Sequence, residues 1–206
     1  MELIAEKVSP ENLSEALRIG DLCFSHDEDR RVIRDGYDWY LNRRDTYWWF
    51  EDFQDKSWSM GYFIYRLQEI YCGISGLYKN EIGDRVWLDY FGVDPKYRGM
   101  GIGTQMLECC IEIVRESGQS KLYVYTDKSN NNTAIEFYLK RKFVEFEERI
   151  VFNEPCIVLV RETVSDPVDR PQNCVGGDRI PPSQPTVLSI AELAKVTPAE
   201  VDALYC

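Results

Sequence analysis

Two hydrophobic patterns run through the chain, and their order predicts a mixed α/β fold. Alternation with the period of a β-strand, in which every second side chain faces the core, covers residues 3–8, 60–67, 70–78, 85–93, 121–126, 144–152 and 156–160. Apolar positions three or four residues apart, which indicate amphipathic helices, cover residues 10–23, 31–42, 101–116 and 133–142. Only Gln68 and Glu69 separate the second and third strand segments, so these form a hairpin and the sheet begins antiparallel.

Residues with helix-capping preferences mark several of these boundaries. Ser9 is expected as the N-cap of the first helix, with Pro10 at its first helical position. Thr133 and Glu136 have the spacing of a capping box at the start of the last helix. Gly118 follows the helix over 101–116 and is expected to end it.

The fourth strand segment leads directly into a glycine-rich turn. Residues 88–103 read LDYFGVDPKYRGMGIG, a strand, a turn and the start of an amphipathic helix. Gly99, Gly101 and Gly103 allow the backbone to approach a ligand closely, and the helix start offers unpaired N–H groups and the positive end of its dipole. The spacing differs from the dinucleotide fingerprint, and the Lys-Ser/Thr ending of a P-loop is missing. The turn is therefore predicted to be an anion site that suits a pyrophosphate.

A second motif lies one strand further along. It comprises Asn131, Ala134, Phe137, Tyr138, Leu139 and Phe143 in the pattern N-x-x-A-x-x-F-Y-L-x-x-x-F. Together with Val-Asp-Pro-x-Tyr and Arg-x-x-Gly-x-Gly in the turn, this motif resembles the GNAT superfamily of acyl-CoA-dependent N-acyltransferases, which includes N-acetyltransferases. The resemblance covers about residues 3–160. It implies the GNAT fold, an α/β (α+β) architecture with a mixed, mostly antiparallel twisted sheet of six to seven strands, about four flanking helices and a splay at the cofactor site.

The resemblance also implies acetyl-CoA, a coenzyme A thioester, as co-substrate. In the family, the pyrophosphate lies on the turn and the pantetheine arm runs beside the strand that ends at Val93. A β-bulge at Gly92 is expected to turn the N–H of Val93 toward the thioester oxygen. The implied cofactor-binding residues are Phe91, Gly92, Val93, Arg98, Gly99, Met100, Gly101, Ile102, Gly103, Thr104, Asn131 and Tyr138.

Tyr138 and Asp89 are the candidate catalytic residues. The family match implies that Tyr138 donates a proton to the departing thiolate, or a hydrogen bond to the CoA sulfur, because a phenol stays protonated at neutral pH. Asp89 is the leading general base, and burial would raise its pKa to a useful value. His26 and Glu51 are weaker candidates for the base. On spacing alone, Tyr138 also fits a core tyrosine and Asp89 a carboxylate satisfied by a neighbouring Arg or Tyr.

Eight aromatic residues gather around the second helix and the segment after it. They are Tyr37, Trp39, Tyr40, Tyr47, Trp48, Trp49, Phe50 and Phe53. In the GNAT fold this region lines the acceptor pocket, so one or two of the rings are expected to face the substrate. Ordinary core packing and contact in a homodimer are the alternatives for the others.

Composition and charge narrow the possible partners. The chain has 206 residues, of which 44% are hydrophobic, and a net charge of −11. This charge argues against nucleic-acid binding and favours a cationic, amine-bearing small molecule or peptide, although an acidic surface also serves solubility alone. The anionic phosphates of CoA would need local positive charge, for which Lys96, Arg98 and Lys128 are the candidates.

Cellular location and metal chemistry follow from the same composition. No apolar run approaches the ~20 residues that cross a bilayer, and the first residues do not have the pattern of a signal peptide. We therefore expect a cytoplasmic protein without membrane association. The seven cysteines include no Cys-x-x-Cys pair and indicate reduced thiols, and the single histidine does not support a metal site.

The composition changes after residue 161, which predicts a three-part organisation. Residues 1–161 form the acyltransferase domain, 162–186 a linker rich in Pro and Gly, and 187–206 a short helical tail that docks on its own domain or on a partner. Two functions fit this organisation. One is N-acetylation of a primary amine on a small molecule, a peptide, or a protein lysine or N-terminus. The other is a non-catalytic acyl-CoA sensor with a partner-docking tail.

Overall fold

The computed structural model describes residues 3–24, 26–42, 48–50, 55–80, 85–128, 132–151 and 154–163. The elements in chain order are β1 (Leu3–Lys7), α1 (Leu13–Cys23), α2 (Asp27–Asn42), β2 (Trp48–Phe50), β3 (Asp55–Leu67), β4 (Ile70–Asn80), β5 (Val86–Val93), the 3₁₀ turn η2 (Pro95–Tyr97), α3 (Ile102–Glu116), β6 (Lys121–Asp127), α4 (Asn132–Leu139), β7 (Val144–Val151) and β8 (Glu154–Glu162). The predicted linker from residue 164 onward, the tail, and the aromatic residues Tyr47 and Phe53 lie outside the described residues.

One mixed sheet forms the centre of the fold. Its strand order is β1-β3-β4-β5-β6-β8-β7, and β2 pairs with β3 off this path. The β5–β6 pair is parallel, and the other described pairs are antiparallel. The predicted mixed, mostly antiparallel sheet with four flanking helices is therefore confirmed. Sequence reasoning missed β2, which is too short at three residues to show an alternating pattern.

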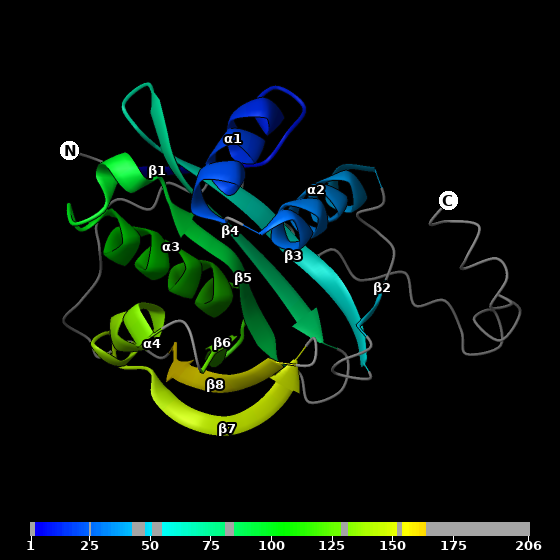
Figure 1. The fold of residues 1–206 in the computed structure, drawn as a ribbon, viewed down its shortest axis with the longest axis vertical. Helices are drawn as coiled ribbons and strands as arrows, with labels where there is room; N and C mark the ends of the chain where they lie inside the picture. Colours follow the sequence, from blue (N-terminus) through cyan, green and yellow to red (C-terminus); the bar gives the residue numbers. More distant parts are fainter. Residues whose placement is uncertain are drawn as a thin grey trace, which may run out of the picture.

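Helices cover both faces of this sheet, α1 and α2 on one and α3 and α4 on the other (Figure 1). The larger core lies beneath α3, where Met106, Leu107 and Cys110 pack on the sheet. The second core lies beneath α1 and α2 and contains Ile19 and Ile33. Among the helices within the described ranges, none is both long and apolar enough to span a bilayer.

The sheet opens between its two parallel strands. The β5–β6 ladder has two residue pairs, Val86 with Leu122 and Trp87 with Tyr123, although both strands continue beyond them. From there the strands separate, so this half of β5 leaves its backbone groups on that side unpaired by β6. The splay that the GNAT resemblance implies is therefore present, and its position is at the C-terminal half of β5.

The irregularity in β5 lies two residues before the position predicted for it. The β4–β5 register passes from Ile74 opposite Gly92 to Gly76 opposite Asp89, so β5 holds one extra residue between these pairs. Tyr90 takes the left-handed conformation there, with φ 42°. The prediction of a bulge at Gly92 is therefore wrong. Gly92 is needed for another reason: a Cβ there would lie 2.9 Å from Cys23 at the end of α1.

The first helix also begins later than its capping signals predict. Its N-cap is Asn12, and helical residues start at Leu13. The Asn12 side chain accepts a hydrogen bond from the Ser9 amide at 2.8 Å and donates one to the Lys7 carbonyl at 3.0 Å. This buried amide therefore stabilises a turn over residues 9–12, which replaces the first helical turn expected from Ser9 and Pro10.

Candidate active site

The glycine-rich turn is anchored at its base and open at its tip. The Asp94 side chain accepts a hydrogen bond from the Lys96 amide at 3.0 Å and forms an ion pair with Arg18 at 3.3 Å. The Asp94 amide donates a hydrogen bond to the Cys72 carbonyl at 2.9 Å. At the tip, Gly99 and Gly101 have φ angles of 77° and 80°. A Cβ built on either glycine would meet nothing within 4 Å, so both face open space.

The amides of this turn are available to a ligand. From Gly99 to Gly103 they donate no hydrogen bond to any part of the chain that the structure describes, whereas the next amide, Thr104, donates to the Gly101 carbonyl at 3.1 Å. The guanidinium of Arg98 lies beside them, where its Nε donates to the Val93 carbonyl at 3.0 Å. Free amides at a helix start, two left-handed glycines and one arginine fit a diphosphate.

A second arginine, which sequence reasoning missed, adds positive charge near this helix start. Arg141 donates from Nε and Nη2 to the hydroxyl of Thr104, at 2.9 and 2.6 Å, and its guanidinium lies 3.7 Å from the centre of the Phe137 ring. It therefore joins the end of α4 to the start of α3. Of the cations proposed from the sequence, Lys96 is exposed, and Lys128 forms an ion pair with Glu148 on β7.

The opening beside β5 is lined by residues of both sequence motifs. The Phe91 ring lies 5.8 Å from the Phe137 ring and 6.3 Å from the Tyr138 ring, measured between centroids. The amide of Asp94 points toward β4. Because successive amides of a strand point to opposite edges, the N–H of Val93 faces the edge from which β6 has separated. An extended ligand could therefore pair with β5 along this edge.

Tyr138 is buried beside the opening between β5 and β6, and its phenol is protonated. Its side chain packs against Phe137 and Phe143, each at 5.2 Å between ring centroids. Burial is the main cause that raises the pKa of Tyr138 well above its usual value, and the nearby Cys110 thiol adds to it. Within the described ranges, the Tyr138 hydroxyl forms no hydrogen bond. It is therefore a proton donor whose acceptor is not supplied by these residues.

Asp89 lies on the other face of the sheet, in register with residues of two neighbouring strands. Tyr62 on β3 is opposite Gly76 on β4, which is opposite Asp89 on β5. A Cβ on Gly76 would lie 2.6 Å from the Tyr62 ring, so this ring extends over the glycine toward Asp89. The Tyr62 hydroxyl and the Tyr90 amide then donate hydrogen bonds to the Asp89 carboxylate.

The surroundings of Asp89 shift its pKa toward neutral pH. Burial raises the pKa of Asp89 to about 7, against the two hydrogen bonds, which lower it. The side chain is half-buried and so still reachable by a small ligand. In a regular strand, alternation would place Asp89 on one face with Trp87 and Phe91. The bulge at Tyr90 leaves Asp89 on the face of Trp87 and turns Phe91 into the core beneath α3.

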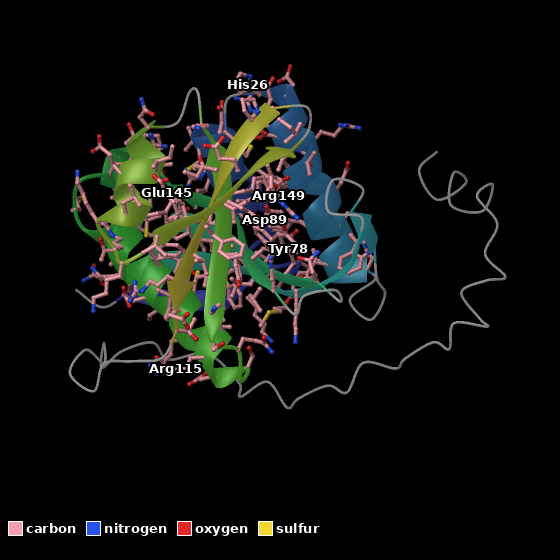
Figure 2. The ribbon with its side chains drawn as sticks, turned by 90° about the horizontal axis from the view of Figure 1, so that it is seen from below. His26, Tyr78, Asp89, Arg115, Glu145 and Arg149 are labelled. Carbon is pink, nitrogen blue, oxygen red and sulfur yellow. The ribbon has the colours of Figure 1, made fainter. Side chains whose placement is uncertain are left out.

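The two weaker candidates for the base, His26 and Glu51, are not found beside Asp89 in the described structure. His26 is exposed at the start of α2 and lies at the upper edge of the molecule in Figure 2, well away from Asp89 near the centre. Glu51 lies outside the described residues, as does Asn131, one of the cofactor-binding residues that the resemblance implies.

Comparison with known proteins assigns this chain to a family. Residues 23–143 match the model of the acetyltransferase (GNAT) family, which is more than half of the chain. The chain belongs to the GNAT acetyltransferase family. A spermine/spermidine N(1)-acetyltransferase of Bacillus subtilis is 36% identical over 69 residues, which make up 34% of this GNAT chain and 45% of that enzyme. The match therefore spans less than half of that relative's length.

Solved structures confirm the GNAT fold across most of the chain. The ribosomal-protein-S18-alanine N-acetyltransferase of Escherichia coli superposes with a TM-score of 0.57 at 16% identity and covers 82% of this chain and 99% of its own. The PaiA N-acetyltransferase of Thermoplasma acidophilum, solved in complex with coenzyme A, has a TM-score of 0.57 at 17% identity and covers 79% and 99%. At these identities the likeness extends to the fold.

Proposed function

We propose that this GNAT chain is an N-acetyltransferase that transfers an acetyl group from acetyl-CoA to a primary amine. The observation that carries this proposal is the separation of β6 from β5 directly beside the free amides of the glycine-rich turn. The matched relatives support an amine acceptor, because spermine and spermidine carry amino groups and the Escherichia coli enzyme is named for N-acetylation of an alanine of ribosomal protein S18.

Binding of the donor is assigned to the turn and to β5. The amides of residues 99–103, with Arg98 and Arg141 nearby, hold the diphosphate, and the free edge of β5 pairs with the pantetheine arm. The N–H of Val93 donates to the thioester oxygen, where negative charge develops during the transfer. When bound, acetyl-CoA supplies the activated acetyl thioester, and the protein contributes position and proton transfer.

The proton transfers are assigned to Asp89 and Tyr138. An alkyl ammonium has a pKa of about 10.4, so it must lose a proton before its nitrogen can attack. The Asp89 carboxylate takes this proton. The amine nitrogen forms a bond to the acetyl carbon as the C–S bond breaks. Tyr138 donates a proton to the departing sulfur, and the phenol then regains a proton from the acylated nitrogen through ordered water. The net reaction releases one proton to the solvent.

A panel of amines with acetyl-CoA tests the proposal. Free thiol should appear only when a suitable amine is present, and mass spectrometry should show the acceptor heavier by one acetyl group. The non-catalytic sensor is not favoured, because it requires the diphosphate site but neither a proton donor nor a base. It predicts CoA binding by calorimetry with no acetylated product from any amine or peptide in the panel, and that result would contradict our assignment.

Replacing Gly101 by Val is expected to weaken CoA binding at least tenfold. The left-handed φ of 80° costs an L-residue about 1–2 kcal/mol, and the new side chain would project into the space assigned to the diphosphate. Calorimetric titration with CoA measures the effect. Gly118→Val is the matched control, because Gly118 has φ 82° and equally open surroundings at the far end of α3. Equal affinity in both variants would place the diphosphate elsewhere.

Replacing Tyr62 by Phe is expected to move the acidic limb of the pH–rate profile to higher pH by about one unit. The Tyr62 hydroxyl stabilises the charged form of Asp89, so its removal raises the pKa of this carboxyl above about 7. The profile of kcat/KM between pH 5 and 9 measures the shift. Tyr71→Phe serves as control, since the Tyr71 hydroxyl donates to Glu6 instead. An unmoved limb would show that Asp89 is not the group that titrates.

A further inference from the structure

The Asp89 carboxylate has no cationic partner within the described part of the chain. Its hydrogen-bond donors are neutral, the Tyr62 hydroxyl and the Tyr90 amide, and no Lys, Arg or His among the described residues contributes to its electrostatic environment. Buried and half-buried carboxylates in proteins are normally paired with a cation or protonated. A carboxylate that is poised to ionise near neutral pH without a partner is suited to a cationic ligand.

Tyrosines from four different elements lie near enough to this carboxylate to feel its charge. Its charge acts on the phenols of Tyr37 on α2, Tyr62 on β3, Tyr78 on β4 and Tyr90 on β5. Figure 2 shows Tyr78 and Asp89 close together near the centre of the molecule. We call Asp89 and these four tyrosines the tyrosine cage. The faces of aromatic rings attract cations, and most strongly where water is excluded.

The other ionisable groups around the cage add no positive charge. Tyr125 on β6 acts electrostatically on Tyr62, Tyr78 and Tyr90, and Asp29 on α2 acts on Tyr90. The Cys23 thiol, at the end of α1, acts electrostatically on Tyr37. Arg98 reaches Cys23 but makes no contribution at Asp89. The field inside the cage therefore favours a cation.

One polar group of the cage is left unpaired. Tyr37 is only 1% exposed. Its buried hydroxyl forms no hydrogen bond in the described structure. Its ring is held edge-to-face against Tyr62 at 5.1 Å between centroids, so the phenol is fixed beside the Tyr62–Asp89 pair. Buried hydroxyls without a partner are rare, and such a group often awaits a ligand or water.

We propose that the tyrosine cage binds the acceptor as an aliphatic ammonium ion, with its charge beside Asp89 and one N–H donated to the Tyr37 hydroxyl. This inference rests on the proposed function and specifies its substrate class. The cage selects alkyl amines, which are cations at neutral pH, and discriminates against arylamines, which are neutral there. It also brings the ammonium to its base, since one of its N–H protons faces the carboxylate that removes it.

A pair of isosteric inhibitors tests whether the cage recognises positive charge. Choline and 3,3-dimethyl-1-butanol have the same shape, but only choline is a cation, and neither has a nitrogen that can be acetylated. Against n-butylamine as acceptor, choline is expected to inhibit at a concentration at least tenfold below that of the alcohol, and this difference should disappear in Asp89→Asn. Equal inhibition by the two compounds in the unmodified protein would overturn the proposal.

The Tyr37 hydroxyl is tested separately by Tyr37→Phe. The KM for n-butylamine should rise about fivefold while kcat stays within twofold, and Tyr71→Phe, which removes a hydroxyl outside the cage, should change neither. A Tyr37→Phe variant with the KM of Tyr71→Phe would contradict the assignment. If n-butylamine is not acetylated at all, calorimetry of choline binding to the CoA-loaded protein, compared with Asp89→Asn, tests the cage independently of the proposed function. Binding that is lost in Asp89→Asn supports the cage, and the absence of binding to the unmodified protein overturns it.

Discussion

Replacing Asp89 by Asn is expected to lower kcat/KM for an amine acceptor about a thousandfold at pH 8. Asn has the same shape and can still accept the hydrogen bonds from the Tyr62 hydroxyl and the Tyr90 amide, so the site keeps its geometry. It cannot accept a proton, and general base catalysis is worth about 10²–10⁴ in rate. Steady-state kinetics at saturating acetyl-CoA measure the loss.

The pH dependence of this variant distinguishes the base from a merely structural residue. In the unmodified protein, kcat/KM should rise as pH increases through about 7, because Asp89 loses its proton there. In Asp89→Asn this limb should be absent. Asp35→Asn, which removes an exposed carboxylate on α2, should keep both the rate and the limb. A variant at Asp89 that retains the limb would show that another group is the base.

The same substitution should stabilise the fold at alkaline pH. Burial raises the pKa of Asp89 from 3.8 to about 7, so the folded state holds a proton that the unfolded chain has released between these values. The stability that this carboxyl provides is complete below pH 3.8 and is lost as pH rises through about 7. Asp89→Asn should therefore raise the melting temperature by a few degrees at pH 8, with a smaller gain toward pH 4. If Asp89 is the proposed base, this loss of stability accompanies its catalytic role.

Local sequence patterns identified the parts of the site that depend on local backbone geometry. The turn over residues 98–103 requires glycine at two left-handed positions, and a helix must follow to leave free amides, so both requirements are visible in one short stretch. The strand and helix patterns likewise placed β4, β5 and α3 close to their observed bounds, whereas β3 begins five residues before its predicted start at residue 60. Such features need no knowledge of distant residues.

Features that depend on strand register could not be predicted in this way. Tyr62 reaches Asp89 only because both are opposite Gly76, and this pairing requires the alignment of three strands. The bulge at Tyr90 follows from the same alignment, since nothing about a tyrosine favours a left-handed φ. Arg141 was missed because its partner, Thr104, is 37 residues away in sequence. For the contact between Tyr62 and Asp89, the available signal was Gly76, because a glycine in a buried strand leaves room for a large neighbouring side chain.

Replacing Tyr138 by Phe is expected to lower kcat about a hundredfold and to leave the affinity for CoA nearly unchanged. The ring keeps its contacts with Phe137 and Phe143, and no hydrogen bond to the described residues is lost. Only the proton for the departing thiolate disappears. This thiolate has a conjugate acid with a pKa of about 8.5, whereas the phenol, already a weaker acid at about 10, is weaker still once buried.

The phenol can therefore protonate the sulfur only as the C–S bond breaks, when the developing negative charge draws the proton, and the loss should appear in kcat at saturating concentrations of both substrates. Single-turnover kinetics measure this step directly, and calorimetry with CoA checks the affinity. Tyr71→Phe provides the matched control, because its hydroxyl lies at β1 and β4 and bonds to Glu6. Unchanged turnover in Tyr138→Phe would remove this residue from the chemistry and assign the proton to water in the opening between β5 and β6. A fall in CoA affinity that accounts for the whole effect would instead make the Tyr138 hydroxyl a binding group for the sulfur.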